Sequence, residues 1–477
     1  MDRSPFLGVA YQARSKSLAS QRVINLYLES AEVKPGGASA PAAFFGCPGL
    51  VVQLVLGGGP SRAARTAGNL LYAVSGANVY SLTPSLVPTL LGTLATSSGP
   101  AYIVANDTQV GFFDSVGLKV WDGANLNTVT LPYSGPVGMP AYIDTLCLLT
   151  QPGTFNIWQC DSNDLTTWNP LSFTTEDGNA EFVIGLAALH DQVVVFKQYS
   201  TCFYVNEGNP GFAFGRLTGV YPVTGCVNAT SIAVLNEKVL WLGQNKNENA
   251  KVYVLEGYQP QEISTYAIEN SINAYSTYQD AYALAYGQDG HPFYVLNFPS
   301  GNQTWVLDLK ETGLLKTPVW HERAAFQSGL FGLYAGSTAV QFNGQVYMGD
   351  YRNGNLYRLD LDNFQDAGQT RKWLRSWRAT VVPSMATEKC NYLDIQCGTG
   401  IHVPIGTNPQ IVLRQSFDRG YNWSAERYGA IGKTGETMND IRFTRLGATN
   451  RGLNSDRIFE LSSTDNFKPA FMASEVG

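Results

Sequence analysis

The chain has 477 residues, which is too long for one ordinary hydrophobic core and predicts two domains, or one repetitive domain with an appendage. It is 44% hydrophobic but only 15% charged, and its 48 glycines and 23 prolines favour short strands joined by tight turns over long charged helices. The net charge of −6 comes without a run of Lys or Arg, which argues against a protein that grips DNA through its phosphates.

Targeting and metal-binding signals are missing from the sequence. The opening MDRSPFLGVAYQARSKS lacks the apolar segment of a signal peptide, and no later stretch approaches 18 uninterrupted apolar residues, so we expect a soluble protein made in the cytoplasm. Seven scattered cysteines without a C-x-x-C pair predict reduced thiols, and four histidines without metal-ligand spacing predict no zinc site. We expect no cofactor.

Residues 1–60 precede the repeat described next. Within them, QRVINLYLES (21–30) predicts a strand and GCPGL (46–50) predicts a turn. We expect this segment to be an N-terminal arm that includes a strand closing a ring built from later residues.

From residue 61 to about residue 370, the chain returns repeatedly to a short strand that carries an apolar residue followed by an aromatic residue. Successive aromatic residues are between 37 and 52 residues apart, which is the period of a propeller blade. The seven pairs are Val79-Tyr80, Val120-Trp121, Ile157-Trp158, Phe203-Tyr204, Val252-Tyr253, Thr304-Trp305 and Leu356-Tyr357.

Most of these strands follow a partner strand across a Gly or Asn turn, as in LLYAVSGANVYSL and VYMGDYRNGNLYRLDL. Gly and Asn accept the positive φ of tight hairpin turns. We therefore expect each pair of strands to form an antiparallel hairpin, which is half of a four-stranded blade. The sequence therefore predicts an all-β fold with an irregular β-propeller of six or seven blades over residues 61–370. Stacked sandwiches are the alternative.

From Arg371 onward the pattern changes, and segments such as RKWLRSWRATVV and IVLRQSFDRGYNW predict a C-terminal β-sandwich-like module over residues 371–477. This module contains S-x-D-x-G-x-x-W, the pattern of a sialidase Asp-box, at Ser416, Asp418, Gly420 and Trp423. The motif shapes a turn: Ser416 and Asp418 can bond backbone N–H groups, Gly420 accepts an unusual backbone conformation, and Trp423 covers the loop.

A glycan-cleaving enzyme needs more than one such turn. A sialidase would carry several boxes on successive blades, an arginine cluster and a tyrosine–glutamate pair, whereas here a single box lies outside the repeat. The glycine-rich GGGPSR (57–62) lacks the G-K-[ST] of a phosphate-binding loop. We therefore name no catalytic, cofactor-binding or metal-binding residue and expect that the protein is not an enzyme.

Four stretches, in this order along the chain, resemble the tail hub or nozzle proteins of short-tailed bacteriophages, also called packaged-DNA stabilisation proteins. They are VINLYLES with the later CPGL, the long block 164–205 that begins DLTTWNPLSF, CNYLDIQCGTG (390–400), and LRQSFDRGYNWSAERYGAIG (413–432). From the first stretch to the last, the resemblance spans most of the chain, and the order of the stretches carries it.

The resemblance implies a structural virion protein that includes a β-propeller. Six copies would form a ring below the portal and its adaptor, extend the DNA channel, retain the packaged double-stranded DNA without reading its sequence, and mount a needle or plug and tail fibres or spikes. The protein would be assembled in the host cytoplasm and reside in the virion tail. The alternative is a carbohydrate-binding or glycan-cleaving propeller of a tail spike. A generic scaffold propeller would explain the repeat but not the ordered resemblances.

Overall fold

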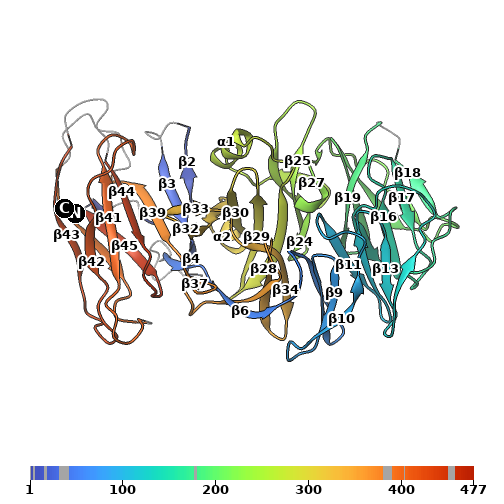
Figure 1. The fold of residues 1–477 in the computed structure, drawn as a ribbon. Coiled ribbons are helices and arrows are strands. Elements are labelled where there is room, and N and C mark those ends of the chain that lie inside the picture. The colour runs from blue at the N-terminus through green and yellow to red at the C-terminus, as the bar shows by residue number, and fades with distance from the viewer. Residues whose placement is uncertain are drawn as a thin grey trace.

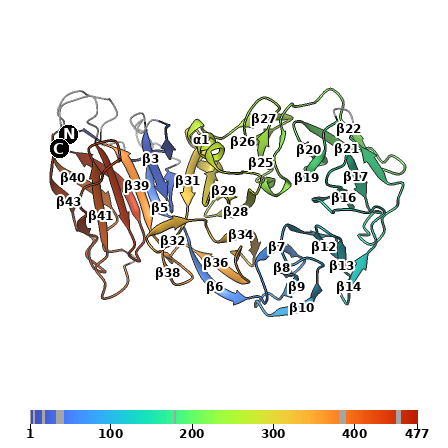
Figure 2. The same ribbon diagram turned by 45° about the horizontal axis from the view of Figure 1, so that its top comes forward.

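The computed structural model describes residues 2–3, 6–14, 19–31, 42–176, 180–379, 389–401, 403–449 and 457–476. Figures 1 and 2 show a ring of small sheets at one end of the elongated molecule and a pair of larger sheets at the other, where both chain termini lie. Short alternating strands separated by Gly and Asn turns form the small sheets. In one of them, Gly76 adopts φ +57° in the two-residue turn between paired Ser75 and Asn78.

The first four blades are four-stranded antiparallel sheets whose strands follow one another along the chain. Blade 1 contains β7 (Ser61–Ala67), β8 (Leu70–Ser75), β9 (Asn78–Leu82) and β10 (Pro88–Thr93). Blade 2 contains β11 (Ala101–Ala105), β12 (Val110–Asp114), β13 (Leu118–Trp121) and β14 (Leu126–Val129). Blade 3 contains β15 (Pro140–Ile143), β16 (Leu146–Thr150), β17 (Asn156–Gln159) and β18 (Phe173–Thr175). Blade 4 contains β19 (Val183–Leu189), β20 (Gln192–Lys197), β21 (Thr201–Asn206) and β22 (Phe214–Arg216).

The last three blades are less regular. Blade 5 contains β23 (Gly225–Cys226), the 3₁₀ helix η2 (Ala229–Ser231), β24 (Ala233–Leu235), β25 (Lys238–Gln244), β26 (Lys251–Glu256) and β27 (Gln259–Glu262), followed by α1 (Tyr266–Ala274). Blade 6 contains β28 (Tyr282–Gln288), β29 (His291–Phe298), β30 (Gln303–Asp308), α2 (Leu309–Leu315) and β31 (Val319–Arg323). A hairpin of β32 (Ala325–Gln327) and β33 (Leu330–Gly332) leads to blade 7, with β34 (Gly336–Phe342), β35 (Gln345–Asp350) and β36 (Asn355–Asp360).

The blades are arranged in a closed ring. Their innermost strands contact one another in the order β7, β11, β15, β19, β24, β28 and β34, and β34 returns to β7. The described residues thus form seven blades, and the expected all-β propeller is confirmed. Hydrophobic clusters fill the spaces between neighbouring blades, as between blades 1 and 2, where Val74, Val79 and Phe112 are fully buried.

A strand from the N-terminal region closes the ring. β6 (Gly49–Val55) pairs antiparallel with β36 as the fourth strand of blade 7, and β37 (Gln365–Asp366) and β38 (Gln369–Thr370) extend the same sheet. Blade 7 therefore joins residues about three hundred positions apart in the chain. The first residue of β6, Gly49, has no room for a side chain, because an added methyl group would collide with the carbonyl oxygens of Asn363 and Gln365.

The two larger sheets form a sandwich. One has the order β4 (Leu26–Ser30), β5 (Ala42–Gly46), β45 (Ala470–Val476), β40 (Lys389–Cys397) and β43 (Ile441–Ala448), with β1 (Asp2–Arg3) beside β45. The other has the order β3 (Ser20–Ile24), β39 (Trp373–Arg378), β44 (Ile458–Ser463), β41 (Gln410–Ser416) and β42 (Arg427–Ala430), with β2 (Tyr11–Gln12) beside β3. Both sheets mix strands from the two ends of the chain.

The segment expected as an N-terminal arm, residues 1–60, serves two parts of the structure: β3, β4 and β5 belong to the sandwich, whereas β6 belongs to blade 7. The sandwich strands of residues 371–477 therefore share both of their sheets with the N-terminal region. This sharing leaves no local mark in the sequence, because it depends on pairing between distant strands. The division into domains at 60 and 370 stays a prediction.

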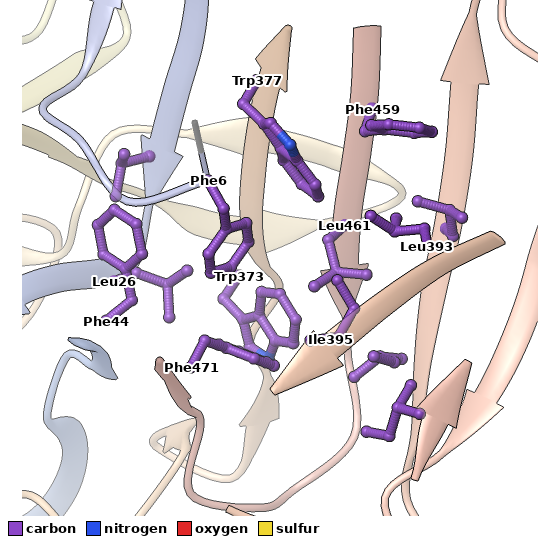
Figure 3. Close-up of a cluster of buried hydrophobic side chains, with 14 of the residues drawn as sticks. Phe6, Leu26, Phe44, Trp373, Trp377, Leu393, Ile395, Phe459, Leu461 and Phe471 are labelled. Atoms are coloured by element: carbon purple, nitrogen blue, oxygen red, sulfur yellow. The ribbon is translucent and has the colours of Figure 1, made fainter. Parts of the chain in front are cut away.

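An aromatic core holds the sandwich together (Figure 3). Phe6 from the N-terminal region packs edge-on against Trp377 with ring centroids 4.8 Å apart, and Trp373 contacts Phe471 at 4.9 Å. Each fully buried aromatic side chain removes enough apolar surface from water to contribute roughly 2–3 kcal/mol. The core of the sandwich therefore includes buried side chains from both ends of the chain.

Substitution of Gly49 tests the closure of the ring. We expect Gly49→Ala to lower the free energy of unfolding by about 1–3 kcal/mol, because the methyl group pushes β6 away from residues 363–365. Gly287→Ala is the matched control, since a methyl group there meets open space. Urea denaturation of both variants checks the expectation, and equal stability of the two would contradict a tight closure at β6.

Candidate functional site at the junction of propeller and sandwich

The Asp-box-like turn lies between β41 and β42, in the sandwich. The Ser416 hydroxyl donates to Asp418 Oδ1 at 2.8 Å and accepts the backbone N–H of Gly420 at 2.8 Å. Gly420 has φ +82°, in the left-handed region that Gly adopts without strain. The Asn422 backbone N–H donates to Asp418 Oδ1 at 2.8 Å. Trp423 is half-buried, and the Arg414 guanidinium lies 5.3 Å from the centre of its ring.

The chemistry of Asp418 is that of a turn residue. The Asn422 backbone N–H, the Asn422 side chain and the Ser416 hydroxyl lower the pKa of Asp418 to about 2, so this carboxylate is ionised at neutral pH and occupied by donors from its own loop. A general acid would instead need a pKa raised towards neutral pH. The geometry fits a turn-forming role for Ser416, Asp418, Gly420 and Trp423.

Reactive groups elsewhere are buried or dispersed. All seven cysteines have free thiols, and burial raises the pKa of Cys160 to about 11 and of Cys226 to about 12, which keeps these thiols protonated and unreactive at neutral pH. Within the described ranges, no three His, Cys, Asp or Glu side chains come together as metal ligands. None of the described helices is long and apolar enough to cross a membrane.

A buried asparagine lies where the N-terminal chain passes between propeller and sandwich. Asn25 separates β3 from β4, is 2% exposed, and has φ +55°. Its side-chain amide donates to the backbone carbonyls of Ala324 and Lys372, both at 2.8 Å, and its carbonyl oxygen accepts the Ala324 N–H at 3.0 Å. Asn25 thereby ties the end of blade 6 to the start of the C-terminal sandwich strands.

An ion pair with one buried partner lies beside Asn25. Arg22 on β3 donates two hydrogen bonds, of 2.8 and 2.9 Å, to the carboxylate of Glu322 on β31, and Gln303 donates a third at 2.9 Å. The bidentate geometry fixes the direction of both side chains, and Glu322 is almost fully buried. Next to this pair, β3 runs parallel to β31 at Ile24, so the sheet of blade 6 continues into the sandwich.

A second buried contact connects blade 6 with the other sheet of the sandwich. Asp308 accepts a hydrogen bond from the Glu311 N–H as the N-cap of α2, and its other oxygen lies 2.7 Å from His291 Nδ1. Glu311 in turn accepts the backbone N–H of Ser30 on β4 at 3.1 Å. Both sheets of the sandwich are thus hydrogen-bonded to blade 6.

No sequence motif predicted this junction. The Asn within VINLYLES is its only local signal, because an Asn between apolar residues of a strand is unusual unless its amide is satisfied. The partners of Asn25 are backbone groups about three hundred residues away, which no local pattern identifies.

The fold is that of an all-β propeller protein. The buried polar side chains described above stabilise its turns and join the propeller to the sandwich. A family model described as "Bacteriophage P22 Gp10, beta-propeller", of the phage stabilisation family, matches residues 7–363. The match covers more than half of the chain and includes all seven blades. The chain belongs to this family and is a structural protein of a bacteriophage, as the resemblance in its sequence predicted.

Solved structures with a similar arrangement share little sequence with this chain. The extracellular domain of a putative hybrid two-component system from B. thetaiotaomicron matches with a TM-score of 0.44 and 10% identity, over 85% of this chain and 47% of that one. The WD40 domain of Neurospora crassa Pan2 matches with a TM-score of 0.41 and 11% identity, over 66% and 95%. The N-terminal domain of Nup159 matches with a TM-score of 0.40 and 13% identity, over 72% and 99%. No curated protein matches the sequence.

A substitution at Asn25 can remove its side-chain hydrogen bonds without straining its backbone. Asn25→Gly retains a residue that accepts φ +55° but leaves two buried carbonyls and one buried N–H without their partner. We expect the free energy of unfolding to fall by at least about 2 kcal/mol. Asn236→Gly is the matched control, because Asn236 also has positive φ but is exposed in the two-residue turn between β24 and β25. An Asn25→Gly variant as stable as this control would contradict the joining role.

His321 makes the junction sensitive to acid. Burial, together with the nearby Arg323 and His291, lowers the pKa of His321 well below its usual value. The unfolded chain takes up a proton below about pH 6.5 that the folded chain does not, so this residue makes stability fall as the pH drops below that value.

We expect His321→Phe, which keeps the aromatic packing against Phe293, to flatten the loss of stability between pH 6.5 and pH 5. The difference in free energy of unfolding between this variant and the wild type should change by up to about 1.4 kcal/mol per pH unit. The surface substitution His190→Asn is the control, because Asn also tolerates the positive φ at that position. Parallel pH profiles for the wild type and His321→Phe would show that His321 titrates normally.

Proposed function

We propose that this chain is the subunit of a tail hub, or nozzle, of a short-tailed bacteriophage. Six copies form a ring below the portal and its adaptor, extend the DNA channel, retain the packaged DNA, and mount a needle or plug and the tail fibres or spikes. The observation that carries the proposal is the family match over residues 7–363, which includes the closing strand and every blade of the propeller. Assembly takes place in the host cytoplasm, and the protein resides in the virion tail.

The connection between the propeller and the sandwich supports this role. The sheet of blade 6 continues through β3 into the sandwich, and buried contacts of Asn25 and Glu322 lie on both sides of this connection. A tail component has to hold pressurised DNA and transmit force without deforming. A continuous hydrogen-bonded sheet resists such deformation better than two domains on a flexible linker.

The charge distribution also supports a conduit. Over residues 61–370, Asp and Glu outnumber Lys and Arg, and residues 120–196 contain no Lys or Arg. Each phosphate neutralised by a protein cation strengthens DNA binding and would slow ejection. An acidic propeller near the channel repels the phosphates, so DNA slides past it.

The alternative, a glycan-binding or glycan-cleaving propeller of a tail spike, has no comparable support. Its strongest sequence feature was the Asp-box, and Asp418 in this box is held by donors of its own loop.

Electron cryomicroscopy of the purified chain, alone and mixed with the portal and adaptor proteins of the same phage, tests the proposal. A ring of six copies attached beneath the adaptor is the expected result. A monomer or trimer that does not bind the adaptor would contradict it. A screen for release of sugars from host surface glycans then distinguishes the alternative, because the hub should produce none.

A further inference from the structure

An arginine is buried in the core of the sandwich. Arg375 lies in the middle of β39, and strand alternation places its side chain on the same inward face as Trp373 and Trp377. It is 0% exposed, although arginines are almost never fully buried unless they are paired. Its neighbours across the sheet are Val23 on β3 and Leu461 on β44, neither of which is charged. The sheet therefore offers this guanidinium no counter-charge.

The rest of the described chain leaves most of this guanidinium unpaired. Arg375 Nε donates to the Phe6 carbonyl oxygen at 2.8 Å, and the centre of the Phe44 ring lies 5.1 Å from the guanidinium carbon. Nη1 and Nη2 are both buried and have no hydrogen-bond partner among the described residues. The acid of the neighbouring strand β44, Glu460, faces the other side of the sheet, where it binds Arg414. Burial therefore lowers the pKa of Arg375 to about 9, because no nearby acid offsets it.

Other fully buried arginines of the molecule use their terminal nitrogens. Arg457, in the same sandwich, donates from them to Gln415 Oε1 and to two backbone carbonyls. Arg323, in the propeller, donates from Nη1 to the Tyr334 hydroxyl at 3.2 Å. Most of the N–H donors of a guanidinium belong to its Nη groups, and in Arg375 these donors and the positive charge both lack a partner. Such a group is strongly unfavourable in an apolar core unless an acceptor with a negative charge accompanies it.

The N-terminal segment 6–10, which we call the strap, lies against the terminal nitrogens of Arg375. A Cβ added at Gly8 would lie 3.8 Å from Arg375 Nη2 and 3.1 Å from Gln21 Oε1. A side chain at position 8 would therefore fill the space beside Nη2, and glycine leaves this space to a small ligand. Gly8 and Gln21 are half-buried, so the space lies just beneath the surface of the sandwich, where a small movement of the strap admits an ion.

We propose that the sandwich binds a small monovalent inorganic anion, of the size of chloride, between Arg375 and the strap. Nη1 and Nη2 donate to the ion, and Gln21 can turn the NH2 of its amide towards it. One negative charge compensates the one charge of the guanidinium. A phosphate would bring more charge and more acceptors than the donors at this place can satisfy.

An anion at this place fixes the N-terminal end of the chain. Within the strap, Phe6 packs against Trp377 and Phe471, with ring centroids 4.8 and 6.2 Å apart (Figure 3). The Ala10 N–H donates to the carbonyl oxygen of Trp320 on blade 6 at 3.4 Å. An ion that holds the strap against Arg375 therefore stabilises both the core of the sandwich and its contact with the propeller. This inference concerns the single chain and does not depend on the proposed function.

Urea denaturation of the full-length chain in sodium chloride and in sodium gluconate tests the proposal. Equal ionic strength keeps the screening of surface charges the same, and gluconate is too large for the space under the strap. Once chloride saturates the site, we expect the unfolding constant to fall about tenfold for each tenfold rise in chloride. Arg375→Met should abolish this response, whereas Arg442→Met, which removes an exposed arginine paired with Asp394, should retain it.

A second variant keeps Arg375 and fills the space beside it. Gly8 does not have the positive φ that disfavours other residues, so Gly8→Ala changes the space more than the backbone. We expect the dissociation constant for chloride, obtained from the same denaturation series, to rise at least about tenfold. Gly287→Ala is the matched control, because a methyl group there meets open space, and it should respond to chloride as the wild type does.

Crystals of the wild type grown in sodium bromide locate the ion directly. An anomalous bromide peak in contact with Nη1 and Nη2 of Arg375 is the expected result. Density of a water molecule without an anomalous signal at that position would overturn the proposal. Equal stability of the wild type in chloride and gluconate, or a chloride response that Arg375→Met and Gly8→Ala both retain, would overturn it as well. Each of these results leaves the proposed hub untouched, because none depends on the assembly of copies.

Discussion

The side-chain amide of Asn25 is the constraint on which the arrangement of the molecule depends. Its three buried hydrogen bonds hold the N-terminal chain against Ala324, at the end of blade 6, and against Lys372, at the entry to the sandwich. On one side of Asn25, β3 continues the sheet of blade 6. On the other side, β4 begins the opposite sheet of the sandwich, and the chain then reaches blade 7. The positive φ of Asn25 makes the change of direction possible within one residue.

Both halves of the molecule depend on their first strands. Blade 7 is incomplete without β6, and both sheets of the sandwich are incomplete without β3, β4 and β5. The N-terminal segment is synthesised first but can pair only after the last blade and the C-terminal strands exist. Such long-range pairing lowers the folding rate, because the chain must pay the entropy of closing large loops before the contacts form. In return, the folded protein has its two ends fixed in one core, which resists unfolding from either terminus.

Acidic residues outnumber basic residues over residues 61–370, which supports the DNA conduit proposed above. The turn at Ser416–Trp423 is held by hydrogen bonds within its own loop. A motif shared with glycan-cleaving enzymes here stabilises a hairpin, which agrees with a structural role for the chain.

The sequence by itself determined what depends on neighbouring residues. Strand alternation, turns such as Gly76 and the spacing of the aromatic strands predicted the hairpins and the propeller, and the S-x-D-x-G-x-x-W pattern located its turn, because backbone conformation and turn hydrogen bonds are local. Only the tertiary structure decided that the blades number seven rather than six, that β6 is the N-terminal strand that completes blade 7, and that Asn25 joins the propeller to the sandwich. These features arise from edges and buried backbone groups that meet across about three hundred residues, and local sequence patterns carry no record of which distant edge will be the partner.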